Sequence, residues 1–283
     1  MNKIIFISDP HICAPGKRII GLDPSARLTQ VLDTATKAHS DAAAIILLGD
    51  LTHHGSPEEY RELDRILAQI TTPIIPMLGN HDRRDAFLDQ FPDAPVTSSG
   101  HVQQWRDIGD HRIVTMDSLD GPPYPEGRHA GKLCPSRLAF LDEALSSRAG
   151  RHAVVCIHHP PFLTGVVGMD RINLHDGPKV LDLLARHGNL HLVCGHLHQT
   201  ISGNSRGVPW TVFKSPCHQG VVDLKQANSS LSIDEPGAYG LALLADDGVI
   251  IHSIDVGTRA LIWTDYSSRK LPRPPRQEKQ ELK

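Results

Sequence analysis

The sequence predicts an α/β fold in which two sheets pack face to face with helices on the outside. Short apolar runs alternate with segments of helical periodicity through most of the chain. These runs are rich in Ile, Val and Leu, which is typical of strands buried on both faces. After Gly207, strand-like runs follow one another through turns such as Asp246-Asp247-Gly248, without helices between them. The chain therefore combines an alternating α/β part with a later β-rich part.

The expected elements can be placed in order along the chain. Buried strands are expected at residues 3–8, 43–48, 74–78, 112–116, 153–157 and 190–194, and later strands at 210–213, 241–245 and 249–254. Helices are indicated by apolar residues spaced three and four apart, as in Leu28, Val31, Leu32 and Ala35, in Tyr60, Leu63, Ile66, Leu67 and Ile70, in Leu138, Leu141 and Leu145, and in Val180, Leu181 and Leu184. Ser56-Pro57-Glu58-Glu59 is a capping box that opens the second helix, and Gly188 is expected to end the fourth.

Composition limits the class of protein. The 283 residues carry a net charge of −3 with a pI near 6.6, so no basic field indicates nucleic acid or a membrane surface as a partner. No apolar run approaches the roughly 18 residues that span a bilayer, and the N-terminus lacks the features of a signal peptide. The five cysteines show no CxxC spacing, so neither a disulfide framework nor a zinc finger is expected. A cytoplasmic protein is predicted, with one domain over residues 1–266 and a polar tail over 267–283.

Metal-binding side chains follow the predicted strands. The chain has 18 histidines, and histidine is the commonest metal ligand. Five strand ends carry the clusters Ser8-Asp9-Pro10-His11, Gly49-Asp50-Leu51, Gly79-Asn80-His81-Asp82, His158-His159-Pro160-Pro161 and Gly195-His196-Leu197-His198. Ligands gather at the carboxyl ends of strands in open α/β sheets. The sequence therefore predicts a metal site built from several strand ends.

The spacing and the donor types suggest two ions. In an extended chain the period of two aims Asp9 and His11, and likewise His196 and His198, to the same side. Glycines before Asp50, Asn80 and His196 allow a tight turn and a close approach. Oxygen and imidazole donors without thiolates favour Mn, Fe, Zn or Co, and seven ligands exceed what one tetrahedral ion needs. Asp50 is the candidate bridge between two such ions.

The ordered set D-x-H, GD, GNHD, H and GHxH resembles the calcineurin-like metallophosphoesterase superfamily over roughly residues 3–198. GDLTHHGSPEEY (residues 49–60) and HHPP (residues 158–161) are most similar to the bacterial class III cyclic-nucleotide phosphodiesterases and glycerophosphodiesterases. The resemblance implies a four-layer α-β-β-α sandwich with a binuclear centre of divalent or mixed-valence transition-metal ions. It assigns Asp9, His11 and His198 to one ion, Asn80, His158 and His196 to the other, and Asp50 to both.

The resemblance also implies substrate contacts and a reaction. Asn80, His81 and His218 are expected near the substrate, with His81 as the catalytic residue. The expected reaction is hydrolysis of a small phosphodiester, either a 3′,5′-cyclic nucleotide or a glycerophosphodiester, by attack of a metal-bound hydroxide. His81 is expected to assist as a hydrogen-bond donor or general acid. A phosphomonoesterase of the same fold and a non-catalytic scaffold remain alternatives, and a homo-oligomer is the preferred assembly.

Several neighbouring residues have more than one interpretation. His159 either supports His158 or fixes its loop, and loop support is favoured. His53 and His54 either approach the substrate or lie on the surface. Asp82 is expected to support the turn at Asn80 and His81, and Asp117 to be structural. Arg83 and Arg84 either pair with a second phosphate or form an exposed helix start.

Overall fold

The computed structural model describes residues 1–124, 129–225 and 231–257 as an α/β sandwich with two large sheets at its centre. The expected polar tail at 267–283 and the end of the expected domain, residues 258–266, lie outside the described residues. The helices are α1 (Pro24–Ala38), α2 (Pro57–Leu67), α3 (Arg84–Gln90), α4 (Pro135–Ser146), α5 (Val167–Asp170) and α6 (Gly177–His187). None of the helices in the described ranges combines the length and apolar character that a membrane crossing requires.

Each large sheet mixes parallel and antiparallel strands. The first has the order β13-β12-β1-β2-β3 and comprises β1 (Asn2–Ile7), β2 (Ala44–Leu47), β3 (Ile74–Pro76), β12 (Gly237–Ala245) and β13 (Gly248–Val256). The second has the order β4-β5-β6-β7-β9-β8 and comprises β4 (Gln104–Ile108), β5 (His111–Met116), β6 (His152–Ile157), β7 (Leu190–Cys194), β8 (Ile201–Ser205) and β9 (Val208–Val212). A small pair, β10 (Gln219–Gly220) and β11 (Ser232–Ile233), lies apart from both.

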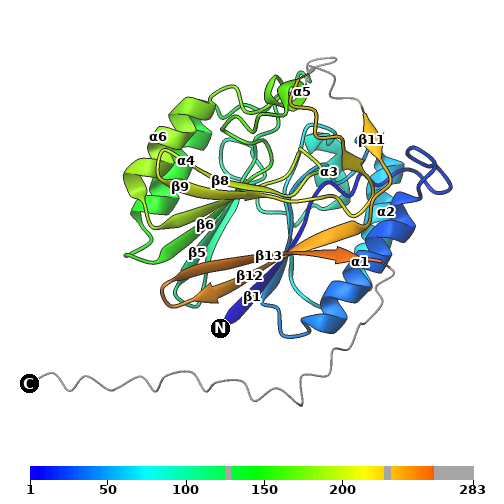
Figure 1. Ribbon diagram of the computed structural model, residues 1–283, viewed down its shortest axis with the longest axis horizontal. Coiled ribbons are helices and arrows are strands. Elements are labelled where there is room, and N and C mark those ends of the chain that lie inside the picture. The colour runs from blue at the N-terminus through cyan, green and yellow to red at the C-terminus, as the bar shows by residue number, and fades with distance from the viewer. Residues whose placement is uncertain (125–128, 226–230, 258–283) are drawn as a thin grey trace, which may run out of the picture.

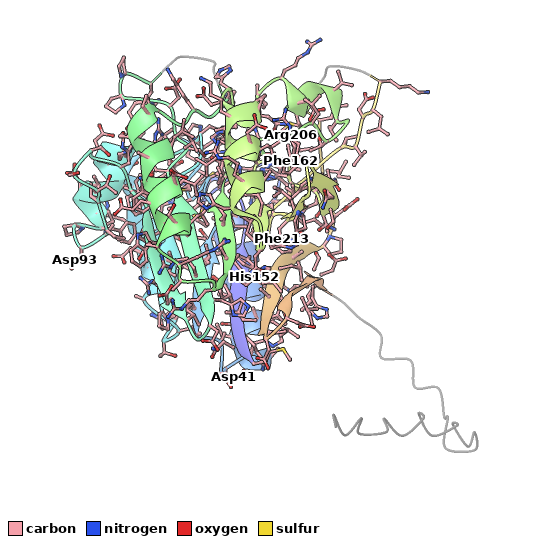
Figure 2. The ribbon with its side chains drawn as sticks, turned by 90° about the vertical axis from the view of Figure 1, so that its left-hand side faces the viewer. Asp41, Asp93, His152, Phe162, Arg206 and Phe213 are labelled. Carbon is pink, nitrogen blue, oxygen red and sulfur yellow. The ribbon has the colours of Figure 1, made fainter. Side chains whose placement is uncertain are left out.

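Three apolar clusters separate four layers, which confirms the predicted sandwich. Ile4 and Phe6 of β1 face Val154 and Cys156 of β6 in the cluster between the two sheets. Ile5 and Ile7, which alternate with them along β1, pack against α1 and α2. The outer face of the second sheet packs against α4 and α6 in the same way. In Figure 1, α4 and α6 lie on one side of the strands and α1 and α2 on the other, and Figure 2 looks onto α4 and α6.

The strands read as continuous apolar runs because both of their faces are covered. All of the residues Ile4, Ile5, Phe6 and Ile7 have no exposed surface. Phe213 also lies between the sheets and stacks on Phe6, with ring centroids 5.5 Å apart. Cys156 and Cys194 are completely buried, as expected for core cysteines. The β-rich part after Gly207 forms no separate unit, since β9 extends the second sheet and β12 and β13 complete the first.

The helix boundaries follow the predicted local signals. Ser56 caps α2 and accepts from the backbone N–H of Glu59, whose side chain accepts in turn from the N–H of Ser56. Gly188 follows the last residue of α6 with φ 54°. The sequence prediction missed β4 and β8, which form the two edges of the second sheet. Both are mostly exposed and polar, so they lack the apolar run by which the buried strands are recognised.

Candidate metal centre

The five strand-end clusters come together in the folded chain. Three of them follow β1, β2 and β3 of the first sheet, and two follow β6 and β7 of the second. The carboxyl ends of parallel strands from both sheets therefore meet at one place, rather than along the edge of a single sheet. All seven predicted ligands lie there, namely Asp9, His11, Asp50, Asn80, His158, His196 and His198.

One set of donor atoms gathers around Asp9, His11 and His198. Their nitrogen and carboxylate atoms lie within 4.8 Å of one another. The Nε2 atoms of His11 and His198 face each other at 3.0 Å, and the Nε2 of His198 lies 3.6 Å from Oδ1 of Asp9. Two imidazole nitrogens and a carboxylate that converge in this way form a set of N and O donors suitable for a divalent transition-metal ion.

A second set adjoins the first and shares Asp50 with it. Oδ1 of Asn80 lies 3.3 Å from Nε2 of His158, and His196 has a ring nitrogen within 4.8 Å of one on His158. Oδ2 of Asp50 lies 3.4 Å from Nε2 of His158 and 3.5 Å from Nε2 of His11. The carboxylate of Asp50 thus stands between the two sets, as a bridging ligand must.

The hydrogen bonds of the histidines fit metal binding. His158 donates from Nδ1 to the backbone carbonyl of Leu48 at 2.7 Å, and His198 donates from Nδ1 to that of His218 at 2.9 Å. These bonds leave the Nε2 lone pairs facing the other donors, which is the usual arrangement for metal-binding histidines. Nε2 of His196 is buried without any hydrogen-bond partner. An unpaired buried nitrogen is costly, and a bound ion would satisfy it.

The electrostatics of the site also favour bound cations. Burial raises the pKa of Asp9 to about 7, which the nearby His158 only partly offsets. Burial would lower the pKa of His158, but the carboxylates of Asp50 and Asp9 raise it to about 9. Both shifts mean that buried negative charge attracts protons to this place. Metal ions would supply that positive charge in place of the protons.

The backbone around the ligands is not extended, and here the sequence reasoning was wrong. Asp9, His11, Asp50, His196 and His198 have φ values of 53°, 47°, 48°, 73° and 52°. Non-glycine residues at positive φ are uncommon and cost about 1–3 kcal/mol each. Asp9 and His11 are left-handed, so the period of two of an extended strand does not account for the convergence of their side chains. Such strain concentrates at functional sites.

Two glycines permit the close packing of these loops, as the sequence indicated. A Cβ atom on Gly79 would lie 2.7 Å from Nε2 of His158 and would also meet Asp50. A Cβ atom on Gly195 would lie 2.9 Å from Oδ2 of Asp9. Both distances are shorter than real Cβ contacts. Any larger residue at either position would displace the donor atoms.

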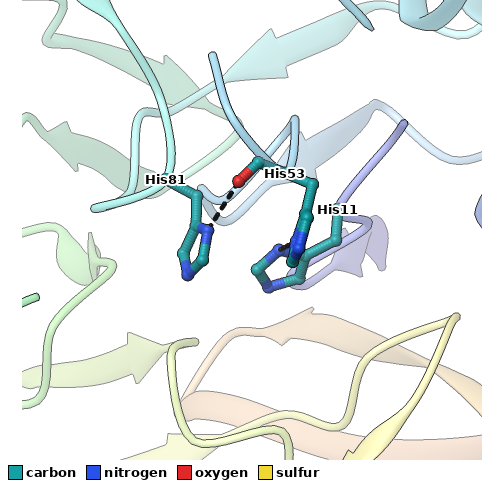
Figure 3. Close-up of side chains that lie close together, drawn as sticks. All are labelled: His11, His53 and His81. Atoms are coloured by element: carbon teal, nitrogen blue, oxygen red, sulfur yellow. Dashed lines mark hydrogen bonds between the residues drawn. The ribbon is translucent and has the colours of Figure 1, made fainter. Parts of the chain in front are cut away.

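His81 lies beside the first set, and its ring offers a nitrogen within 4.8 Å of ring nitrogens of His11 and His53. Its backbone N–H donates to Oδ1 of Asp50 at 2.8 Å, and its Nδ1 donates to the backbone carbonyl of His53 at 2.8 Å. Figure 3 shows this bond. It also shows a second contact of His53, whose ring Nδ1 lies 3.3 Å from Nδ1 of His11. Nε2 of His81 remains for the adjoining cavity, and it can donate only when the ring is protonated.

That cavity is about 390 Å³ in volume and opens onto both donor sets. His53 and His218 line it, whereas His54 does not and instead pairs with Glu59 at 2.9 Å beside the capping box. The ring of His218 lies 4.5 Å from that of His198, measured between centroids. The structure therefore brings all three predicted substrate-contacting residues, Asn80, His81 and His218, to one cavity.

The sequence reasoning missed His129, which lies between these features. Its Nδ1 is 3.0 Å from Nδ2 of Asn80, and its ring stacks on that of His81 with centroids 5.3 Å apart. Its carbonyl accepts from Nε2 of His159 at 3.1 Å, while Nδ1 of His159 bonds to Ser118 at 2.7 Å. His159 thus uses both ring nitrogens in the loop structure, which supports the favoured interpretation. No strand-end motif marks His129, so sequence patterns gave no signal for it.

The remaining polar residues support the loops. Asp82 accepts from the backbone N–H groups of Gly79 and Leu51 at 2.9 and 3.1 Å, which agrees with the expected supporting role. Arg84 is only 6% exposed and forms a two-point ion pair with Asp117, at 2.8 and 2.9 Å. The expectation of an exposed or phosphate-binding Arg84 is therefore wrong. Arg83 does remain exposed, over the ring of Tyr124.

Comparison with known proteins points to one family. A family model described as calcineurin-like phosphoesterase matches residues 2–200. A protein of Rhodopseudomonas palustris named as a probable cyclic nucleotide phosphodiesterase is 38% identical over 88% of this chain and 91% of its own length. The 3′,5′-cyclic adenosine monophosphate phosphodiesterase CpdA of Pseudomonas aeruginosa is 29% identical over 94% of this chain and 93% of its own length.

Further matches include a second named activity and a shared fold. A probable glycerophosphodiester phosphodiesterase, GpdQ of Arcobacter nitrofigilis, is 26% identical over 90% of this chain and 93% of its own length. The crystal structure of a dimetal phosphatase from Danio rerio superposes with a TM-score of 0.67 at 14% identity, covering 89% of this chain and 95% of the other. At that identity the likeness concerns the fold alone.

Proposed function

Because the chain belongs to the calcineurin-like phosphoesterase family, we propose that it hydrolyses small phosphodiesters at a two-metal centre held by its strand-end loops. The position of Asp50 carries the proposal, since its Oδ2 atom lies 3.4–3.5 Å from a histidine of each donor set. Asp9, His11 and His198 would hold one ion, and Asn80, His158 and His196 the other. Mn, Fe, Zn or Co suits these donors.

The reaction follows from the residues that face the cavity. When bound, two metal ions neutralise phosphoryl oxygens and lower the pKa of a water molecule. A water oxygen forms a bond to phosphorus and releases a proton to solvent while the ester P–O bond breaks, and the departing alkoxide takes a proton. His81 is placed to supply that proton from Nε2, because the carbonyl of His53 holds its other nitrogen. His218 and Asn80 would orient the phosphate beside it.

The substrate is a 3′,5′-cyclic nucleotide or a glycerophosphodiester under this proposal, since relatives with either name match nearly the whole chain. A phosphomonoesterase is the alternative within the fold. We also propose that the chain forms a homo-oligomer in the cytoplasm. Size-exclusion chromatography with light scattering of the full chain tests the assembly.

The decisive experiment is a substrate panel after metal reconstitution. The metal-stripped chain would be loaded with Mn, Co, Fe or Zn and assayed with cyclic nucleotides, glycerophosphodiesters, phosphomonoesters and bis-p-nitrophenyl phosphate. We expect metal-dependent hydrolysis of diesters and about two ions per chain by elemental analysis. Asp50→Asn keeps the shape of the side chain but removes the charge between the two sets, so it should lose both ions and activity. Exclusive turnover of monoesters would favour the alternative, and no turnover with any metal would favour a scaffold.

A further inference from the structure

The cavity beside the donor atoms has a second chemical character, and we propose that its apolar wall binds the base of a nucleotide. The wall consists of Met169, Ile172 and Leu231. This inference rests on the proposed function, and it selects a nucleotide over a glycerophosphodiester as the substrate. It also names Met169 and Ile172 as specificity-determining residues.

The size and lining of the cavity fit a small ligand with one polar and one apolar end. Its volume of about 390 Å³ lies in the range of about 300–1,000 Å³ that is usual for small-molecule sites. His11, His81 and His198 supply its polar lining, and Met169, Ile172 and Leu231 supply apolar lining. A substrate whose phosphate lies at the metal-binding atoms would have the rest of its molecule facing these apolar side chains.

The loop that carries Met169 and Ile172 is built to hold a fixed shape. The carboxylate of Asp170 accepts hydrogen bonds from the backbone N–H groups of Thr164 and Gly165, at 2.8 and 3.0 Å, and from the side chain of Asn173 at 3.2 Å. Asn173 also donates to the carbonyl of Phe162 at 2.9 Å. These bonds close the loop on itself, so its apolar side chains stand in a preformed position.

The start and the end of the same loop are anchored to the protein. Phe162 stacks on Trp210 with ring centroids 3.9 Å apart. The backbone N–H of His175 donates to the carbonyl of Gly131 at 2.9 Å, and that of Leu174 donates to Pro160 at 3.1 Å. Pro160 directly follows His158 and His159, so the apolar loop is tied to the metal centre through the chain itself.

The chemistry of the wall discriminates between the two substrate classes. The hydroxyl groups of glycerol lose their water in a site and require polar partners, which Met169, Ile172 and Leu231 do not offer. A glycerophosphodiester whose second alcohol carries a quaternary ammonium group would need aromatic faces or carboxylates in the cavity, because these groups recognise such a cation. Among the described residues that line the cavity, Asp50 is the only carboxylate, and none is Phe, Tyr or Trp. A planar base instead offers an apolar face, and methionine sulfur makes favourable contacts with aromatic rings.

Part of the wall remains open to solvent. Leu231 of the wall is 50% exposed. Exposed apolar groups that cluster at a cavity mark a place where a ligand covers them. Because methionine and aliphatic side chains make no base-specific hydrogen bonds, the wall should accept several different bases.

A matched pair of ligands tests the inference without turnover. AMP and ribose 5-phosphate share the sugar and the phosphate and differ in the base at C1′. Their dissociation constants would be measured by calorimetry on the full chain reconstituted with Mn²⁺. We expect AMP to bind at least about tenfold more tightly, a factor that burial of a modest apolar area supplies. GMP should also bind more tightly than ribose 5-phosphate, by a similar factor.

Polar substitutions in the wall provide the second measurement. Met169→Gln and Ile172→Thr keep side-chain length and branching while adding polar atoms, and together they should bring the AMP and ribose 5-phosphate constants to within about twofold of each other. Leu163→Gln is the matched control, because Leu163 lies in the same loop, is 77% exposed and does not line the cavity. It should leave the difference unchanged.

The outcomes separate this inference from the proposed function. Equal affinity of the native chain for AMP and ribose 5-phosphate would overturn base binding, even if diesters are hydrolysed. A preference for AMP that survives the double substitution would overturn the assignment to Met169 and Ile172. If the base preference is found but no phosphodiester is hydrolysed, the proposed function fails while the base site stands.

Discussion

Nδ1 of His129 lies 3.0 Å from the amide nitrogen of Asn80, so His129 determines which way that amide faces. With Nδ2 donating to His129, Oδ1 is left to face Nε2 of His158 at 3.3 Å. An amide oxygen is a metal ligand and an amide N–H is not. His129 is therefore a positioning residue for one of the two proposed ions.

We expect His129→Ala to weaken binding of one ion by about 10–100-fold, the usual effect of losing a group that orients a ligand. Titration of the metal-stripped chain with Mn²⁺ checks this, with two sites resolved. His129→Gln restores an acceptor for the Asn80 amide and should recover most of the affinity. His175→Ala, at an exposed histidine in a nearby loop, serves as the control. Equal affinity in His129→Ala and the native chain would remove the positioning role.

The role of His81 can be separated from metal binding. His81→Ala should lower kcat by about 10²–10⁴-fold, the usual contribution of general acid catalysis, while the metal content stays near two ions per chain. The reason is that His81 contributes a backbone N–H to Asp50, which alanine keeps, and a ring nitrogen to the cavity, which alanine loses. Elemental analysis beside steady-state kinetics provides the measurement. Loss of an ion in this variant would instead identify His81 as a ligand.

The sequence was sufficient to predict the parts of this fold that depend on local pattern. Strands covered on both faces, such as β1 and β6, carry an unbroken apolar run. The capping box at Ser56 likewise depends on residues only three apart. The seven predicted ligands could be named because each follows a recognisable strand. Their roles as ligands stay a prediction, although the structure brings all of them together.

Other features depend on contacts between distant segments, which a single sequence does not display. Arg84 looked exposed because it starts a helix, yet Asp117, 33 residues away in sequence, pairs with it in the interior. His129 meets Asn80 across 49 residues. The left-handed conformation of Asp9 and His11 is also imposed by the tertiary structure, since neither is a glycine.

Cys134 should be the most reactive thiol of the chain near neutral pH. Burial would raise its pKa, but hydrogen bonds from Ser136 and Arg137 lower it to about 7. By contrast, burial raises the pKa of Cys13 to about 11 and that of Cys217 to about 12. The thiolate is the reactive form, so its fraction at Cys134 should rise as the pH rises through about 7.

Alkylation with iodoacetamide followed by peptide mass spectrometry checks this order. Cys134 should be modified first, with a rate that reaches half of its maximum near pH 7. Cys134→Ser should lose the fast phase and leave the slow phases of the buried thiols as they were. A rate that begins to rise only near pH 8.5, the ordinary value for cysteine, would contradict the expected shift.

The buried ion pair of Asp117 with Arg84 should matter for stability. Asp117 is completely buried and Arg84 is 6% exposed. A second guanidinium, that of Arg137, lies 3.8 Å from the same carboxylate. Asp117→Ala would leave buried positive charge uncompensated, which is strongly unfavourable in the interior. We expect the free energy of unfolding to fall by roughly 3–5 kcal/mol, as measured by urea denaturation of the metal-free chain.

An exposed ion pair provides the comparison for this variant. Asp33 pairs with Lys37 at 3.3 Å on the surface of α1, where such pairs contribute little because water and salt screen them. Asp33→Ala should therefore change the free energy of unfolding by no more than about 0.5 kcal/mol. Similar losses in Asp33→Ala and Asp117→Ala would show that burial of the Asp117 carboxylate adds nothing. We expect a much larger loss of the free energy of unfolding in Asp117→Ala than in Asp33→Ala, because Asp117→Ala leaves two buried guanidinium groups without a counter-charge.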